Sequence, residues 1–180
     1  MSEQDFKGTV NGVTINSTTI GPFTKTAVGE VTNPTQPAFL ALNSATDSDV
    51  VGDTGVYFTV IFDTEVYDQN SDFDGTSTFT APVTGRYHFD VCITLLQLGA
   101  NHNSQRIELV TGNRPYTLAL DEFGAGANPF TGRTLKGSVD VDMDAGDTAV
   151  VRVRVDGGTR VVDVLGNAAP YTMFSGHLVC

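Results

Sequence analysis

A histidine, an aspartate and a cysteine, three residue types that carry catalysis in many enzymes, occur within five positions as His88, Asp90 and Cys92. A histidine base can activate a thiol for nucleophilic attack only if the two side chains touch. Apolar residues, however, occupy every odd position from 87 to 95, and polar or small residues occupy the even positions. This period of two predicts a strand with one buried face. At the rise of a strand, His88 and Cys92 stand about 13 Å apart, so we expect no catalysis by this pair. We expect that the protein is not an enzyme.

Short strands separated by turns are predicted for most of the chain from about residue 37. Glycine, threonine and valine are abundant, and no segment has a convincing period of 3.6 residues. Regular spacing of this kind predicts an all-β sandwich or barrel. The expected strands cover 38–42, 56–62, 77–80, 86–96, 105–110, 116–120, 135–143 and 149–155.

Composition and charge exclude several classes of protein. The 180 residues fit about one domain. The net charge of −11 argues against a nucleic acid partner, which needs basic groups for neutralisation. No apolar run of about 18 residues suggests insertion into a membrane. The N-terminus has no basic region followed by an apolar run, so we expect no signal peptide. We expect Cys92 and Cys180 to stay unbonded, because one lies within a strand and the other is the last residue.

Residues 1–36 differ from the rest of the chain. They are rich in Thr, Asn, Gly and Ser and end next to the prolines of the segment NPTQP (33–37). Two prolines in such a segment are typical of a connector. We therefore expect an N-terminal attachment or assembly segment over 1–36 and a β-rich head over 37–180, with a floppy tail as the alternative for 1–36.

Two groups of carboxylates deserve separate interpretations. Asp140, Asp142 and Asp144 alternate along one predicted strand, so they project from one face and are expected to be solvated rather than to surround an ion. Loop carboxylates can converge on a cation, and the predicted loops 47–53 and 68–74 carry several of them. No cofactor is certain, and calcium stays open at Asp47, Asp49, Asp53, Asp68, Asp72 and Asp74.

The order of motifs in the head is more specific than a generic sandwich. FTAPVTGRYHF (79–89), SVDVDMDAGD (138–147) and FSGHLV (174–179) follow one another, after PAFLA (37–41) and IFDTEVYD (61–68). Across residues 37–179 the chain resembles the globular head domain of the complement C1q and tumour-necrosis-factor superfamily. The resemblance implies a jelly-roll β-sandwich of about ten antiparallel strands that assembles as a homotrimer and binds other molecules.

The chain departs from many members of this family in two respects. The chain has neither a Gly-X-Y collagen stalk nor a recognisable signal peptide, which suggests a phage or bacterial member.

In the family's sheet order the closing strand lies beside strand 86–96, and this sheet faces the trimer partners. The resemblance thus places His88, Cys92 and His177 at or near the three-fold contact. Two roles for these residues are open. They could make ordinary polar packing between subunits, or the histidines could form a ring of imidazoles that holds an ion or responds to acid.

In a jelly roll the first and last strands are antiparallel neighbours, so the two termini of the head lie at the same end. We expect a ligand site at the opposite, distal end. If residues 1–36 attach the protein to a particle, this distal end faces outward. Its longest connection is 121–133, and functional residues concentrate on loops held by a rigid scaffold. The predicted ligand-binding residues are Asp121, Phe123, Asn128, Phe130 and Arg133. Burial of the two phenylalanines is the alternative.

Taken together, these observations predict a non-enzymatic trimeric recognition protein. We expect a bacteriophage fibre head or attachment protein on the virion surface, joined to the virion through residues 1–36 and binding a host cell-surface glycan or protein. Two alternatives stay open. One is a bacterial or secreted lectin or surface-layer protein, extracellular or on the bacterial cell surface; the other is a purely structural trimerisation cap.

Overall fold

The computed structural model describes residues 9–10, 13–14, 24–25, 31–123 and 132–180. The chain divides into two compact units, Met1–Thr35 and Gln36–Cys180. None of the described residues forms a helix that is long and apolar enough to cross a membrane. In the first unit, the described residues form two short antiparallel pairs: β1 (Thr9–Val10) with β2 (Val13–Thr14), and β3 (Thr24–Lys25) with β4 (Val31–Thr32).

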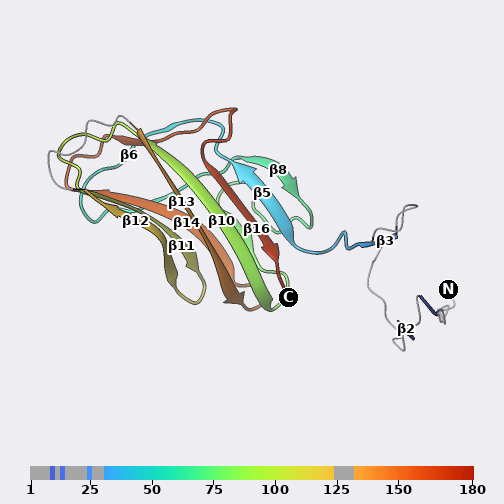
Figure 1. Ribbon diagram of the computed structural model, residues 1–180. Coiled ribbons are helices and arrows are strands. Elements are labelled where there is room, and N and C mark those ends of the chain that lie inside the picture. Colours follow the sequence, from blue (N-terminus) through green and yellow to red (C-terminus); the bar gives the residue numbers. More distant parts are fainter. Residues whose placement is uncertain (1–8, 11–12, 15–23, 26–30, 124–131) are drawn as a thin grey trace. The chain divides into compact units, whose positions relative to one another are not determined.

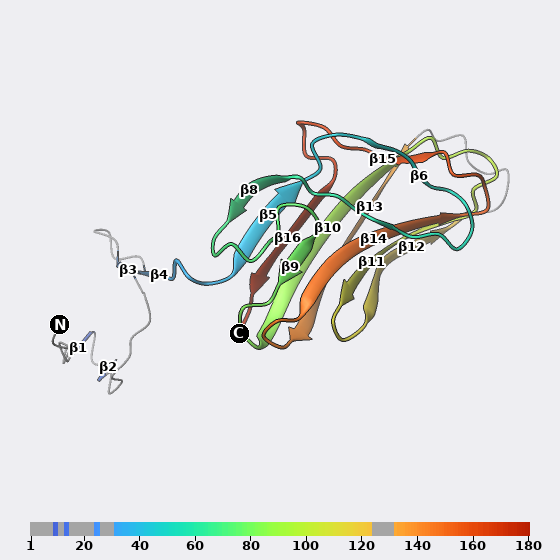
Figure 2. The ribbon, with the colours of Figure 1, turned by 180° about the vertical axis from the view of Figure 1, so that it is seen from behind.

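The second unit is a sandwich of two antiparallel sheets, as predicted (Figure 1). Among the described residues, the strands of the larger sheet follow the order β6 (Asp47–Val51), β15 (Val162–Val164), β10 (Gly85–Leu96), β16 (Met173–Leu178), β5 (Ala38–Leu42) and β8 (Thr64–Asp68). A further strand of this sheet, β13 (Gly132–Met143), pairs with the other side of β10. The smaller sheet, best seen in Figure 2, has the order β12 (Pro115–Glu122), β11 (Ser104–Thr111), β14 (Thr148–Asp156) and β7 (Phe58–Thr59). The short strand β9 (Thr78–Thr80) also pairs with β14.

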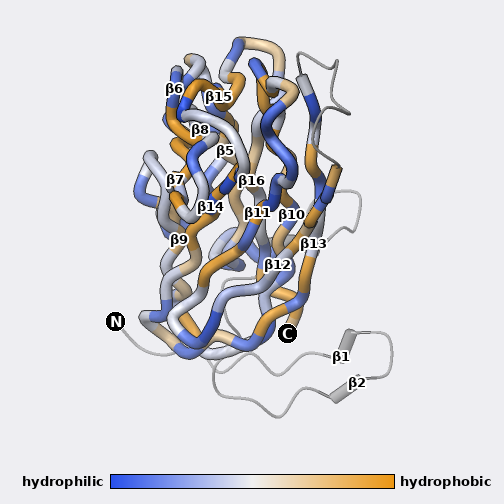
Figure 3. The backbone as a smooth tube through the Cα atoms, turned by 90° about the vertical axis from the view of Figure 1, so that its left-hand side faces the viewer, coloured by the Kyte–Doolittle hydropathy of each residue, from blue (hydrophilic) through white to orange (hydrophobic). Residues whose placement is uncertain are grey.

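Aromatic side chains fill the space between the two sheets. Tyr87 and Phe89, at odd positions of β10, are fully buried, so the predicted alternation is confirmed. Phe39 stacks on Phe73 with 5.0 Å between ring centroids and meets Phe174 edge-on at 4.9 Å. Figure 3 shows hydrophobic and hydrophilic positions alternating along the strands. The period of two therefore gives each sheet one buried and one outer face.

Gly176 lets β16 pack closely over these rings. A Cβ atom at this position would lie 2.5 Å from Cδ1 of Phe89 and 2.9 Å from Cε1 of Phe39. Such distances are far inside van der Waals contact. The glycine of the closing FSG motif is thus required by the aromatic core.

Both ends of the second unit are defined by backbone hydrogen bonds. The N–H of Leu178 donates to the carbonyl of Pro37 (3.0 Å), and the N–H of Arg86 donates to the carbonyl of Cys180 (2.8 Å). The chain therefore enters this unit and ends at the same end of the sandwich, as predicted (Figure 1). At the distal end, the N–H of Leu165 donates to the carbonyl of Thr94 (2.8 Å).

Two predicted elements differ from the structure. The apolar run 56–62 forms only the two-residue strand β7, because Val60 and Phe62 are fully buried in the core while their N–H groups donate to Val151 and Thr76 outside regular strand pairing. Residues 47–51, predicted as loop, form strand β6, because Val51 pairs with Val162 of β15. In all, twelve strands, β5–β16, are assigned in the described part of this unit rather than about ten.

Candidate functional site

His88 lies on the outer face of the larger sheet, between two carboxylates. Its Nδ1 atom is 2.5 Å from Oδ1 of Asp140 on β13, and its Nε2 atom is 3.2 Å from Oδ2 of Asp90 on its own strand. Only the protonated imidazolium carries an N–H on both ring nitrogens. The arrangement therefore favours the charged form of His88.

The electrostatics of His88 follow from these contacts. The hydrogen bond to Asp140 is the largest cause that raises the pKa of His88 above its ordinary value of 6.5; burial opposes it, and the charge of Asp90 supports it. His177 faces His88 across the β10–β16 pair, with 5.4 Å between ring centroids. The structure thus brings His88 and His177 together on neighbouring strands, as the family's sheet order implied, and adds two carboxylates.

Cys92 occupies a separate part of the same face. It is 7% exposed, and its Sγ–H donates to the carbonyl of Tyr171 at 3.5 Å rather than to a histidine. Burial raises the pKa of its thiol, and the nearby Lys136 partly offsets this. Cys92, Ser138, Met173 and Ser175 line a shallow hollow of about 340 Å³ in the outer face of the sheet. Both cysteines are free.

Apolar side chains extend this outer face toward β5 and β8. Leu40 stands in one cross-strand row with Ser175 and Asp90, and Tyr67 continues the row on β8. Leu40 is half-buried and Tyr67 is 50% exposed. The face thus combines apolar residues at one side with the His88 cluster and the Cys92 hollow at its centre, which is a composition suited to contact with another protein surface.

At the distal end, three of the five predicted ligand-binding residues contact one another. Arg133 of β13 forms an ion pair with Asp121 of β12, and its guanidinium lies 4.9 Å from the centre of the Phe123 ring. Asp121 also accepts a hydrogen bond from Gln105 at 3.1 Å. These contacts join the two sheets. Asn128 and Phe130 lie outside the described residues.

Several of the six carboxylates proposed for calcium accept local hydrogen bonds. Asp68 accepts from the N–H groups of Asp72 and Phe73, and Asp74 accepts from three N–H groups in the turn after it. Asp47 accepts from Asn43. Among the described residues, no three His, Cys, Asp or Glu side chains are placed to hold a metal ion. The solvated face predicted for Asp140, Asp142 and Asp144 is confirmed, although Asp140 pairs with His88.

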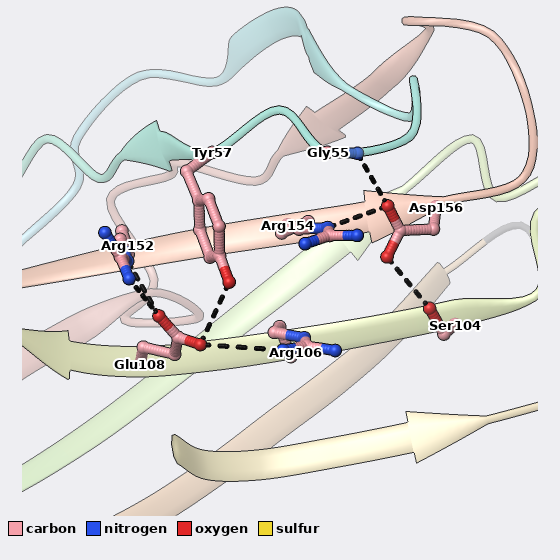
Figure 4. Close-up of polar contacts among 8 residues, drawn as sticks. All are labelled: Gly55, Tyr57, Ser104, Arg106, Glu108, Arg152, Arg154 and Asp156. Atoms are coloured by element: carbon pink, nitrogen blue, oxygen red, sulfur yellow. Dashed lines mark hydrogen bonds and ion pairs between the residues drawn. The ribbon is translucent and has the colours of Figure 1, made fainter. Parts of the chain in front are cut away.

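A buried ionic cluster on the outer face of the smaller sheet was not predicted (Figure 4). The side chain of Glu108 is only 6% exposed, and Arg152 on the neighbouring strand donates to its Oε2 from Nε (2.7 Å) and Nη2 (2.6 Å). The hydroxyl of Tyr57 donates to Oε1 at 3.0 Å, and the guanidinium of Arg152 lies 4.0 Å from the centre of the Tyr57 ring. This network attaches the segment before β7 to β11 and β14.

The cluster continues along the same two strands toward the distal end. Arg154 donates to Oδ1 of Asp156 at 2.7 Å, and Ser104 donates to its Oδ2 at 3.2 Å. Burial opposes ionisation of Asp156, but the hydrogen bonds from Arg154 and from the N–H of Gly55 hold its pKa below the ordinary value. In the sequence these charges alternate with buried apolar residues, which indicates that they share an outer face but not which of them meet.

Comparison with known proteins places this geometry in a family. Residues 38–179 match the C1q domain family. A search of curated protein sequences found no significant match. Among solved structures, the globular domain of zebrafish complement 1qA is similar, with a TM-score of 0.54 and 21% identity, over 81% of this chain and 98% of that one. Murine APRIL is similar with a TM-score of 0.51 and 12% identity, over 80% and 99%. The chain belongs to the C1q domain family.

Proposed function

We propose that the protein is a homotrimeric recognition module whose subunits meet through the outer face of the larger sheet. C1q and tumour-necrosis-factor domains generally form homotrimers, and proteins with such domains are typically non-enzymatic. The observation that carries the proposal is this face itself, with exposed Tyr67, half-buried Leu40 and the hollow beside Cys92 and Met173. Contiguous apolar area of this kind marks an interaction surface.

Light scattering on the full chain tests the assembly. A trimer has three times the 19.1 kDa of one chain. Met173→Glu puts a charge beside the hollow and is expected to dissociate the trimer, because a carboxylate buried in an interface loses its hydration. Leu120→Glu, on the outer face of the smaller sheet, is the matched control and should leave the trimer intact. A wild-type monomer at micromolar concentration would contradict the proposal.

We further propose that the recognised ligand is on a host cell and that the protein is a virion-surface fibre head or attachment protein. Chain entry at Pro37 beside Cys180 supports this, because attachment through residues 1–36 leaves the distal end outward. The ligand is a cell-surface glycan or protein bound by the distal connections. A bacterial or secreted lectin of the same fold remains the second candidate.

Binding to host cells tests this part. Replacing Phe123, Asn128 and Phe130 with alanine is expected to weaken cell binding of an intact trimer. Replacing Val83 with alanine, an exposed residue at the end near Cys180, is the control. Undiminished binding by the triple variant would exclude the 121–133 connection as the site.

A further inference from the structure

The His88 cluster on the outer face of the larger sheet consists of four titratable groups: His88, His177, Asp90 and Asp140. Asp140, His88 and His177 form one cross-strand row over β13, β10 and β16. His88 contacts Asp140 at 2.5 Å and Asp90 at 3.2 Å, and the centre of the His177 ring is 5.4 Å from that of His88. Both carboxylate side chains are 63% exposed, so water still solvates them in a single subunit.

The cluster borders the surface through which we propose that the subunits meet. In the row next to that of His88, Asp90 stands in line with Leu40 of β5 and Tyr67 of β8. Asp90 also lines the hollow of about 340 Å³, together with Met173. A partner surface that covers Leu40, Tyr67 and the hollow therefore also removes Asp90 from water.

The net charge of the cluster depends on its two imidazoles. When both are protonated, two imidazolium ions balance the two carboxylates; when both are neutral, two negative charges remain in each subunit. Nearby on β10 and β13, Arg86 pairs with Asp142 at 3.4 Å, and Lys136 stands opposite Cys92, two rows from His88. Arginine, lysine and ordinary aspartate side chains keep their charges between about pH 6 and 8.5, whereas histidine does not. The imidazoles therefore set how the charge of this face changes with pH.

We propose that the His88 cluster makes the trimer pH-dependent, tighter in mild acid and weaker in mild base, because its imidazolium ions balance Asp90 and Asp140 at the subunit contact. Covering the face excludes water and strengthens the attraction between the imidazolium and its carboxylates. Assembly thus raises the pKa of His88 beyond its already raised value in one subunit, so the trimer is favoured while His88 is protonated. As the pH rises through that pKa, above 6.5, unbalanced carboxylates remain in all three contacts, and their burial opposes assembly. The inference rests on the proposed trimer and names how its assembly is regulated.

Analytical ultracentrifugation of the full chain at pH 6.0 and pH 8.5 tests the inference by measuring the dissociation constant of the trimer. For wild type this constant should be at least about tenfold larger at pH 8.5, since a pKa change of about one unit on assembly corresponds to a factor of about ten for each titrating group. Asp90→Asn with Asp140→Asn should reverse the pH dependence, because imidazolium ions without carboxylates repel one another in the contacts. Glu122→Gln with Asp144→Asn is the matched control, because it removes two charges at exposed positions outside the cluster and should keep the wild-type pH dependence.

A second variant and a folding measurement separate assembly from subunit stability. His88→Gln should weaken the trimer at pH 6.0 and reduce its pH dependence, because glutamine cannot carry the positive charge. Circular dichroism should show folded subunits at both pH values; unfolding together with dissociation would assign the effect to subunit stability and overturn the inference. An equal dissociation constant of wild type at the two pH values, or an unchanged pH dependence in the Asp90 and Asp140 double variant, would also overturn it while the trimer stands. A wild type that is monomeric at both pH values would instead contradict the proposed assembly.

Discussion

The Nδ1 atom of His88 lies 2.5 Å from a carboxylate oxygen of Asp140, one strand away on the outer face of the larger sheet. The second ring nitrogen faces Asp90, and His177 lies on the other side. Among the described residues, these two carboxylates and one imidazole are the titratable groups in contact with His88. Because this contact raises the pKa of His88, it makes stability depend on pH.

We predict that His88 stabilises the protein more in acid than in base. A group with a raised folded-state pKa contributes fully below its unfolded pKa, here 6.5, and its contribution is lost as the pH rises through the folded value. Urea unfolding should therefore show a larger loss of stability from His88→Gln at pH 5.5 than at pH 8.5. Asp140→Asn should remove most of this pH dependence and Asp90→Asn less. An equal loss at both pH values would contradict the assignment.

We predict that Gly176→Ala destabilises the fold. The added methyl group would lie 2.5 Å from the Phe89 ring, and overpacking of a core typically costs about 1–3 kcal/mol. Gly99→Ala is the control, because its nearest neighbour would be 3.7 Å away, in ordinary contact. Thermal unfolding of both variants measures the difference; a melting temperature of Gly176→Ala equal to that of Gly99→Ala would show that β16 can shift away from Phe89.

We predict that Tyr57→Phe weakens the protein through Glu108. The variant keeps the ring over Arg152 but removes the hydroxyl that donates to the nearly buried carboxylate at 3.0 Å. Loss of a hydrogen bond to a charged group costs about 1.5–3 kcal/mol. Chemical denaturation should reveal this loss, whereas Tyr171→Phe, at an exposed position before β16, should have little effect. Equal stability of the two variants would mean that Arg152 alone satisfies Glu108.

We predict that a thiol reagent distinguishes the two cysteines. Cys180 is exposed, whereas Cys92 is buried and burial raises the pKa of its thiol, which lowers the thiolate fraction. Iodoacetamide at neutral pH should modify one site per native chain, at Cys180, and both sites after denaturation. Peptide mass mapping identifies the site. Rapid modification of native Cys92 would show that the outer face opens.

The alternation of residue types along the chain determined the strands and their buried faces. Tyr87 and Phe89 are buried and His88 and Asp90 are not, because side chains of a strand alternate between faces whatever the partners are. The glycine of the closing FSG motif is likewise a local feature, which lets β16 approach the Phe89 ring closely at Gly176. Local geometry is enough for such features.

Which polar side chains meet was decided only by the tertiary structure. His88 and Asp140 face each other because β10 pairs with β13, whose partner register depends on the whole sheet. Tyr57, Glu108 and Arg152 are distant in sequence and converge because β7 and β11 flank β14. Period-two patterning specifies the face on which a charge lies but not its cross-strand neighbour, because register is set by long-range pairing that one strand's sequence does not contain.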